Sequence, residues 1–243
     1  MTFGALCAQG SEANAQVIVL AVKGSVTAVM AGQAATPVKV GDRLPVGAMI
    51  TTAPDSETDI QVFNGAVATV RSDSTCVLEK LSITASGGLV TKQTALIDLK
   101  VGTIASNIDP ANHNINDYGI RTPKGVAAAR GTVYVVNVKP NGKTQVFVTN
   151  SAVTFTINVT DAAGNKTTST VTIPAGTQVT VSNTGVVSQT TLTPAELKQA
   201  NKDAKPSDDQ SVKGGDDNKG GPTTPTPPVI IVDPKKTVSP SST

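Results

Sequence analysis

The chain has 243 residues and is 38% hydrophobic, which is enough for one large all-β domain or two small ones. The formal net charge is only +2 and the basic residues are scattered, so neither nucleic acid nor an anionic membrane is an expected partner. Trp is absent and only 2 Tyr and 4 Phe occur, so Val, Ile, Leu and Ala must fill the core.

Residues 1–15 are similar to the end of a signal peptide, because Ala13-Asn14-Ala15 forms an A-x-A cleavage pattern before Gln16. No positively charged region precedes this pattern, so two interpretations stay open: the start codon has been placed too late, or the pattern is accidental. We expect export to the periplasm, the cell surface or the medium of a bacterium. The longest apolar run, Val17–Val22, is far shorter than the roughly twenty residues of a membrane-spanning helix.

The first strands are predicted from apolar runs separated by glycine turns. Val17–Val22 predicts a buried strand, and Lys23-Gly24 predicts a turn that pairs it with Ser25–Val29 in a hairpin. Further along, Asn64-Gly65 lies between two stretches of β-forming residues. It predicts a hairpin closed by a type I′ turn, because Asn and Gly accept the positive φ that this turn requires.

The middle of the chain continues this pattern. Thr75–Leu81 and Ala95–Val101 alternate as strands, and Gly102 marks the next expected turn. A loop rich in Asn and Asp follows at 107–117 and contains the only histidine, His113. We expect the thiol of Cys76 to be a small buried group on a strand.

Two more hairpins and a final strand pair are predicted before residue 190. Val133–Val138 pairs with Thr144–Val148 through Asn141-Gly142, and Ala152–Val159 pairs with Thr167–Ile173. The strands Gln178–Val181 and Val186–Gln189 close the β region, residues 16–190. The predicted fold class is therefore all-β: stacked short antiparallel strands in a sandwich-like or solenoid-like arrangement.

The composition changes at Thr193. Thr193 and Glu196 form a capping box with Pro194 at the first helical position, which predicts a short helix over 193–204. Residues 205–243 are rich in Pro, Gly, Ser, Lys and Asp and are predicted to be disordered. Within them, Val229–Val232 is a solitary apolar patch that either docks as an added edge strand or stays unpaired.

One block of motifs resembles a known family. The block contains Ile120-Arg121-Thr122-Pro123, Gly125-Val126-Ala127 and Arg130-Gly131-Thr132-Val133-Tyr134-Val135. Supporting motifs upstream are Gly24-Ser25-Val26, Gly41-Asp42-Arg43-Leu44, Gly47, Ile50-Thr51-Thr52, Asn64-Gly65 and Gly102-Thr103-Ile104. With this spacing of turn glycines, the chain resembles the FecR domain family from about Val17 to Val187.

The resemblance implies an extracytoplasmic all-β domain that binds a protein or another component of the cell envelope. The best-known members relay a signal from an outer-membrane transporter to a sigma factor, using a cytoplasmic anti-sigma segment and a membrane helix. Neither segment is recognisable in this sequence, so the leading prediction is a stand-alone, non-enzymatic binding or scaffold module of the bacterial envelope. The alternative is a sensor that regulates a sigma factor through a membrane partner.

Catalytic and metal chemistry have little support in the sequence. His113 would have to serve alone in a Ser-His-Asp arrangement, and no G-x-S-x-G elbow is present. The acidic stretch Asp55–Asp59 either holds Ca²⁺ or forms a solvated turn, and it lacks the glycine and distal glutamate of an EF-hand loop. We therefore expect no catalytic residue, metal or cofactor.

The residues of the motif block have two interpretations. Arg121 and Arg130 either contact a partner or tie down neighbouring loops, with Asp42 and Asp117 as candidate carboxylates. Gly125 and Gly131 are expected to provide positive φ or a close strand approach. The remaining residues expected to shape turns are Gly41, Asp42, Asn64, Gly65, Thr122, Pro123 and Thr132.

Overall fold

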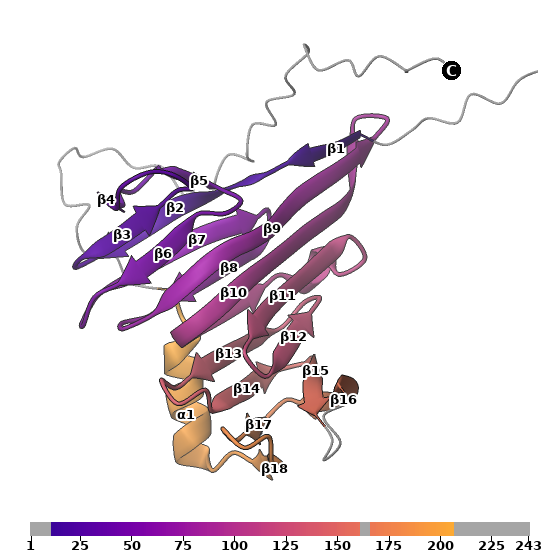
Figure 1. The fold of residues 1–243 in the computed structure, drawn as a ribbon. Helices are drawn as coiled ribbons and strands as arrows, with labels where there is room; N and C mark the ends of the chain where they lie inside the picture. Colours follow the sequence, from indigo (N-terminus) through magenta and orange to yellow (C-terminus); the bar gives the residue numbers. More distant parts are fainter. Residues whose placement is uncertain (1–10, 161–165, 207–243) are drawn as a thin grey trace, which may run out of the picture.

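The computed structural model of the protein describes residues 11–160 and 166–206 and is built mainly of β-strands (Figure 1). The predicted disordered tail beyond Pro206, its Val229–Val232 patch and the first ten residues lie outside the described residues. The strands are β1 (Ser11–Asn14), β2 (Gln16–Lys23), β3 (Val26–Val29), β4 (Thr36–Pro37), β5 (Arg43–Pro45), β6 (Met49–Thr52), β7 (Glu57–Phe63), β8 (Ala66–Val70), β9 (Thr75–Ser86), β10 (Leu89–Ile108), β11 (Asn116–Thr122), β12 (Gly125–Ala129), β13 (Val133–Val138), β14 (Thr144–Asn150), β15 (Ala152–Thr160), β16 (Lys166–Pro174), β17 (Thr177–Val181) and β18 (Val187–Thr191).

The strands form two sheets that share β10. Sheet I has the spatial order β4-β3-β6-β9-β10-β11-β12-β15-β16, with β1 pairing with the second half of β9. Sheet II has the order β5-β2-β7-β8-β10-β13-β14-β17-β18. The first half of β10 pairs in sheet I and its last residues, from Gly102 onward, pair in sheet II.

Both sheets are open. Within the described part of the chain, β4 and β16 at the ends of sheet I, and β5 and β18 at the ends of sheet II, each pair on one side only. The predicted all-β stack is confirmed as an open arrangement of two layers and not a barrel. One pair departs from the antiparallel expectation, because β11 runs parallel to β10 after the chain returns from sheet II to sheet I.

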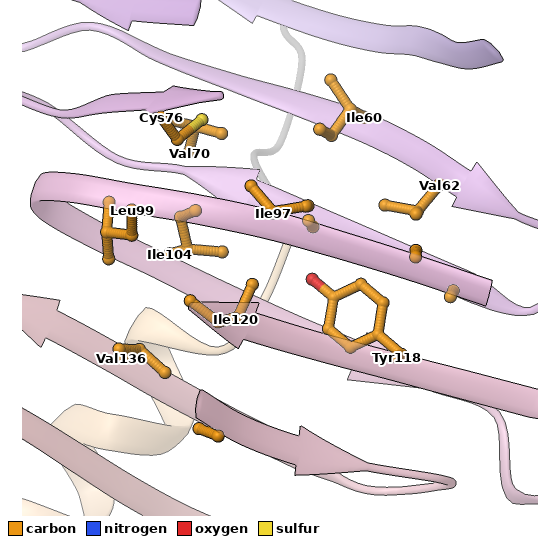
Figure 2. Packing of buried hydrophobic residues seen from close by; sticks show 14 of the residues in the cluster. Ile60, Val62, Val70, Cys76, Ile97, Leu99, Ile104, Tyr118, Ile120 and Val136 are labelled. Atoms are coloured by element: carbon orange, nitrogen blue, oxygen red, sulfur yellow. The ribbon is translucent and has the colours of Figure 1, made fainter. Parts of the chain in front are cut away.

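Aliphatic side chains fill the space between the sheets, as the composition predicts. Figure 2 shows Ile60, Ile97, Leu99, Ile104 and Ile120 facing this interior. The rings of Phe63, Tyr118 and Tyr134 form two edge-to-face contacts, with centroids 6.2 and 6.4 Å apart. The hydroxyls of the two buried tyrosines have partners: Tyr118 bonds Ser106 at 3.0 Å, and Tyr134 donates to the carbonyl of Ala127 at 3.4 Å.

The predicted hairpin between residues 17–22 and 25–29 is wrong. Strand β2 pairs in sheet II with β5 and β7, whereas β3 pairs in sheet I with β4 and β6. Gly24, with φ +74°, makes a corner between the sheets, and the Ser25 amide donates to Ser56 Oγ at 2.9 Å. With β2 and β3 in different sheets, the apolar faces of both strands point into one core. A hairpin within one sheet would bury the same faces, so the local sequence does not distinguish the two arrangements.

The other predicted hairpins are confirmed, with changes in detail. β7 pairs with β8, β13 with β14 and β15 with β16. The turn at Asn64-Gly65 is not type I′, because Gly65 has φ +82° and Asn64 does not have a positive φ. Strands β9 and β10 are longer than predicted, and Gly102 lies inside β10 and not in a turn.

The predicted helix is confirmed as α1 (Pro194–Asp203), which begins with the expected capping box between Thr193 and Glu196. Figure 1 shows α1 beside β13 and β14. It covers the outer face of sheet II, where Ala204 packs with Ala105 and Val135. The helix therefore belongs to the folded unit and does not simply follow it.

Candidate functional site

The Arg130-Gly131-Thr132 motif joins two loops at one end of the stack. A Cβ on Gly131 would lie 2.6 Å from Pro110 Cα, so only glycine allows this approach. Gly131 does not have a positive φ. The buried Thr132 donates its hydroxyl to the carbonyl of Asn150, and its own carbonyl accepts from the Ile108 amide at 3.1 Å.

The Asn64-Gly65 turn belongs to the same group of loops. The Asp109 amide donates to the Gly65 carbonyl at 2.7 Å, and the Asp109 carboxylate accepts from the Ala111 amide at 2.8 Å. That carboxylate caps the short 3₁₀ helix η1 (Pro110–Asn112). His113 follows it, is exposed, and donates from Nδ1 to the Pro110 carbonyl at 2.9 Å. We call residues 64–65, 109–113 and 130–132 the RGT loop cluster.

The Thr122-Pro123-Lys124-Gly125 turn lies at the opposite end of β12. The Thr122 hydroxyl donates to the Gly125 carbonyl at 3.0 Å and accepts from the Lys124 amide at 3.2 Å. Gly125 has φ +153°, and a Cβ there would lie 2.9 Å from Ile157 Cα. Pro123 is exposed on the turn. The hydroxyl and the glycine thus stabilise the turn and let β15 approach β12.

The Gly41-Asp42 turn is separate from both. Gly41 has φ +89° with open space around it, and the Asp42 carboxylate accepts from the Lys39 amide at 2.8 Å. The structure therefore brings together Asn64, Gly65 and the Arg130-Gly131-Thr132 motif, but not the other predicted turn residues.

The two arginines have different surroundings. Arg121 Nε lies 2.9 Å from Glu79, and this exposed ion pair involves neither of the carboxylates considered from the sequence. Arg130 is exposed and makes no ion pair or hydrogen bond with any residue that the structure describes. Val126 opposes Arg121 in the ladder between β11 and β12, and Arg130 comes four residues after Val126. The two arginines are therefore separated by roughly 13 Å along the strand direction. Arg130 is therefore the unpaired cation of the RGT loop cluster.

The acidic stretch at 55–59 is engaged in protein contacts. Glu57 forms ion pairs with Arg71 and, at 3.5 Å, with Lys23. The Asp59 carboxylate accepts from the Thr69 hydroxyl at 2.6 Å. Over the described ranges, no group of three His, Cys, Asp or Glu side chains could hold a metal ion.

Cys76 has the position expected for a structural thiol. It lies on β9, is fully buried, and burial raises its pKa to about 12. A thiol in this state is neutral near neutral pH and is a poor nucleophile.

A second surface feature, which the sequence did not predict, is a groove of about 260 Å³ beside α1. Phe147 and Val135 form its apolar part, and Asn137, Lys139, Gln199 and Asp203 are among its polar lining residues. Next to this groove, the Nη2 atom of Arg71 donates to two carbonyls, that of Asp203 at 2.6 Å and that of Lys205 at 2.5 Å. These partners are 132 and 134 residues from Arg71, and no local sequence signal connects them.

Comparisons with known proteins agree with the motif analysis. A match to the family model described as FecR protein covers residues 48–154. It extends from just before β6 into β15 and includes the RGT loop cluster. No curated protein sequence matches the chain. Of the described helices, none has the length and apolar character needed to span a membrane.

Two crystal structures are similar at low identity. Both are of a candidate anti-sigma factor from Parabacteroides distasonis ATCC 8503, at 1.65 and 2.50 Å resolution. Each aligns with 13% sequence identity and a TM-score of 0.47, and the alignment covers 62% of this chain and 62% of that chain. The chain thus spans less than two thirds of the length of the protein that it matches.

Proposed function

We propose that the protein is the partner-binding β domain of an extracytoplasmic signalling system, and that it regulates a sigma factor through a membrane partner. The observation that supports this function is the FecR match over residues 48–154. The best-known FecR proteins relay a signal from an outer-membrane transporter to a sigma factor. The proposal includes export from the cytoplasm, since such a partner meets the domain outside the inner membrane.

The contact with this partner is proposed to lie at the RGT loop cluster. Gly131 packs against Pro110, and the Thr132 hydroxyl donates to the carbonyl of Asn150. The Arg130 guanidinium, in contrast, has no ionic partner among the described residues. A rigid base with one unpaired guanidinium suits a carboxylate on a protein partner, because guanidinium binds carboxylate with two parallel hydrogen bonds.

The test is site-specific photo-cross-linking in the native host, with the cross-linker at residue 130, followed by identification of the captured protein. Capture of the signalling domain of an outer-membrane transporter, or of an anti-sigma protein, supports the proposal. Capture of cell-wall or surface material alone would overturn it in favour of an envelope scaffold. A reporter for the sigma-dependent genes provides the functional measurement in the same strain.

The matched substitution is Arg130→Glu, with Arg43→Glu as the control. Arg43 is also exposed, lies on the short edge strand β5, and makes no ion pair with a described residue. We expect Arg130→Glu to abolish the cross-link and alter reporter output, and Arg43→Glu to leave both unchanged. Equal effects of the two variants would show that net charge and not the RGT loop cluster matters.

A further inference from the structure

The two ends of the stack differ in how their edge strands are protected. At the end near the N-terminus, β4 has 2 residues and β5 has 3, and both end in a proline, Pro37 and Pro45. At the other end, β16 has 9 residues and β18 has 5. Short strands and prolines prevent edge-to-edge pairing. At the first end both strands are short and both end in a proline, whereas at the second end the strands are longer and only β16 ends in a proline, Pro174.

The edge at β16 carries almost none of the usual protection. It pairs with β15 in continuous register from Lys166 to Pro174, and between these two residues it contains only Thr, Ser, Val and Ile. Strand β18 has no charged residue. Val186, just before β18, is 67% exposed, and Val187, its first residue, is 41% exposed. Within the part of the chain that the structure describes, this end therefore offers unpaired backbone groups next to apolar surface.

We propose that this end binds a second copy of the chain, with β16 pairing with β16 and β18 pairing with β18. Each sheet ends four strands beyond the shared β10, sheet I at β16 and sheet II at β18. A two-fold axis perpendicular to the sheet at an edge strand makes that strand and its copy antiparallel. Such a contact is isologous and closes as a dimer.

The chemistry of the edge suits an identical partner. With the pairing centred on Thr170, the residues near the axis on its face of the sheet are Thr168, Thr170 and Thr172, and threonines pair favourably across strands. The two Lys166 side chains lie eight residues apart along the ladder, roughly 26 Å, so they do not repel each other. The same contact covers Val187. An edge of 14 residues is smaller than the roughly 20–30 residues of a standard interface, so the dimer is expected to depend on concentration.

The test uses charge variants of three exposed threonines, Thr168, Thr170 and Thr172. The two triple variants replace all three with Glu or all three with Lys. Sedimentation of the purified wild-type chain over a range of concentrations should show a monomer–dimer equilibrium. Each triple variant should be monomeric, and an equimolar mixture of the two should again form dimers, because opposite charges then face each other.

Controls separate a lost interface from lost folding. The side chains are exposed, so both triple variants should keep the wild-type melting temperature and far-UV spectrum. Thr91→Glu, at the exposed start of β10, should dimerise as the wild type does. A wild-type chain that stays monomeric at all concentrations would overturn the proposal, as would dimers that persist in both triple variants. Cross-linking of a different protein to Thr170, with a monomeric wild type, would also overturn it.

Discussion

Gly102 and Ser74 are in such close contact that a Cβ at residue 102 would lie 2.5 Å from the Cβ of Ser74. Gly102 has φ +99° and lies where β10 leaves sheet I and enters sheet II. The amide of Thr103, the residue after Gly102, donates to Ser74 Oγ at 2.9 Å. The glycine and the serine together form the point where one strand serves two sheets.

Gly102→Ala is expected to lower the free energy of unfolding by at least about 2 kcal/mol, through positive-φ strain and overpacking against Ser74. Urea denaturation measures the change. Ser74→Ala alone should cost about 1–3 kcal/mol, because it removes the hydroxyl that accepts from the Thr103 amide and that also donates to a backbone carbonyl. It should not rescue the glycine variant, because the backbone of residue 74 also blocks the new Cβ. A Gly102→Ala protein as stable as the wild type would contradict this contact.

Gly131→Val is expected to destabilise the domain by about 1–3 kcal/mol through collision with Pro110, and not through a positive φ. Gly41→Ala tests the opposite case: Gly41 has φ +89° and free space, so only the cost of about 1 kcal/mol for its φ is expected. Thermal or urea unfolding compares the two. If Gly131→Ala and Gly131→Val had no effect, the packing role of Gly131 would be wrong.

Arg71→Ala is expected to loosen α1 from sheet II. Its guanidinium bonds the carbonyls of Asp203 and Lys205 and pairs with Glu57, and hydrogen bonds to charged groups contribute about 1.5–3 kcal/mol each. Hydrogen exchange of the α1 amides should accelerate by about tenfold or more. Exchange in the core strand β10 should stay slow. Arg71→Lys, which keeps the charge but not the fork of donors, should give an intermediate rate.

Alkaline pH is expected to destabilise the fold. Burial raises the pKa of Cys76 from 9.0 to about 12, and it also raises the pKa of Tyr118 and Tyr134. A group with a raised folded-state pKa contributes stability below its unfolded pKa and loses it as pH rises toward the folded value. The melting temperature should therefore fall above pH 9, and Cys76→Ala should reduce the slope there. A thiol reagent should modify native Cys76 only at the rate of unfolding, and fast modification of the native protein would contradict its burial.

Local sequence was sufficient wherever the structure depends on neighbouring residues. The hairpins at Asn64-Gly65 and Asn141-Gly142 follow from turn glycines between β-forming residues, and the α1 capping box follows from Thr193 and Glu196. The FecR motifs were recognisable for the same reason, because they are largely turn residues. The type of the first turn was wrong, since Asn64 does not take a positive φ.

Contacts between distant residues were decided only by the tertiary structure. The sequence by itself determined an all-β chain with glycine turns and one capped helix, because periodicity and turn chemistry act over a few residues. It did not determine which sheet each strand joins, because an apolar face meets the core equally well in either sheet. The predicted pairing of β2 with β3 was therefore wrong, and the strand predicted to end at Val101 continues as β10 to Ile108. The contact of Gly131 with Pro110 and that of Arg71 with α1 depend on how the sheets and the helix pack, and no local pattern encodes either.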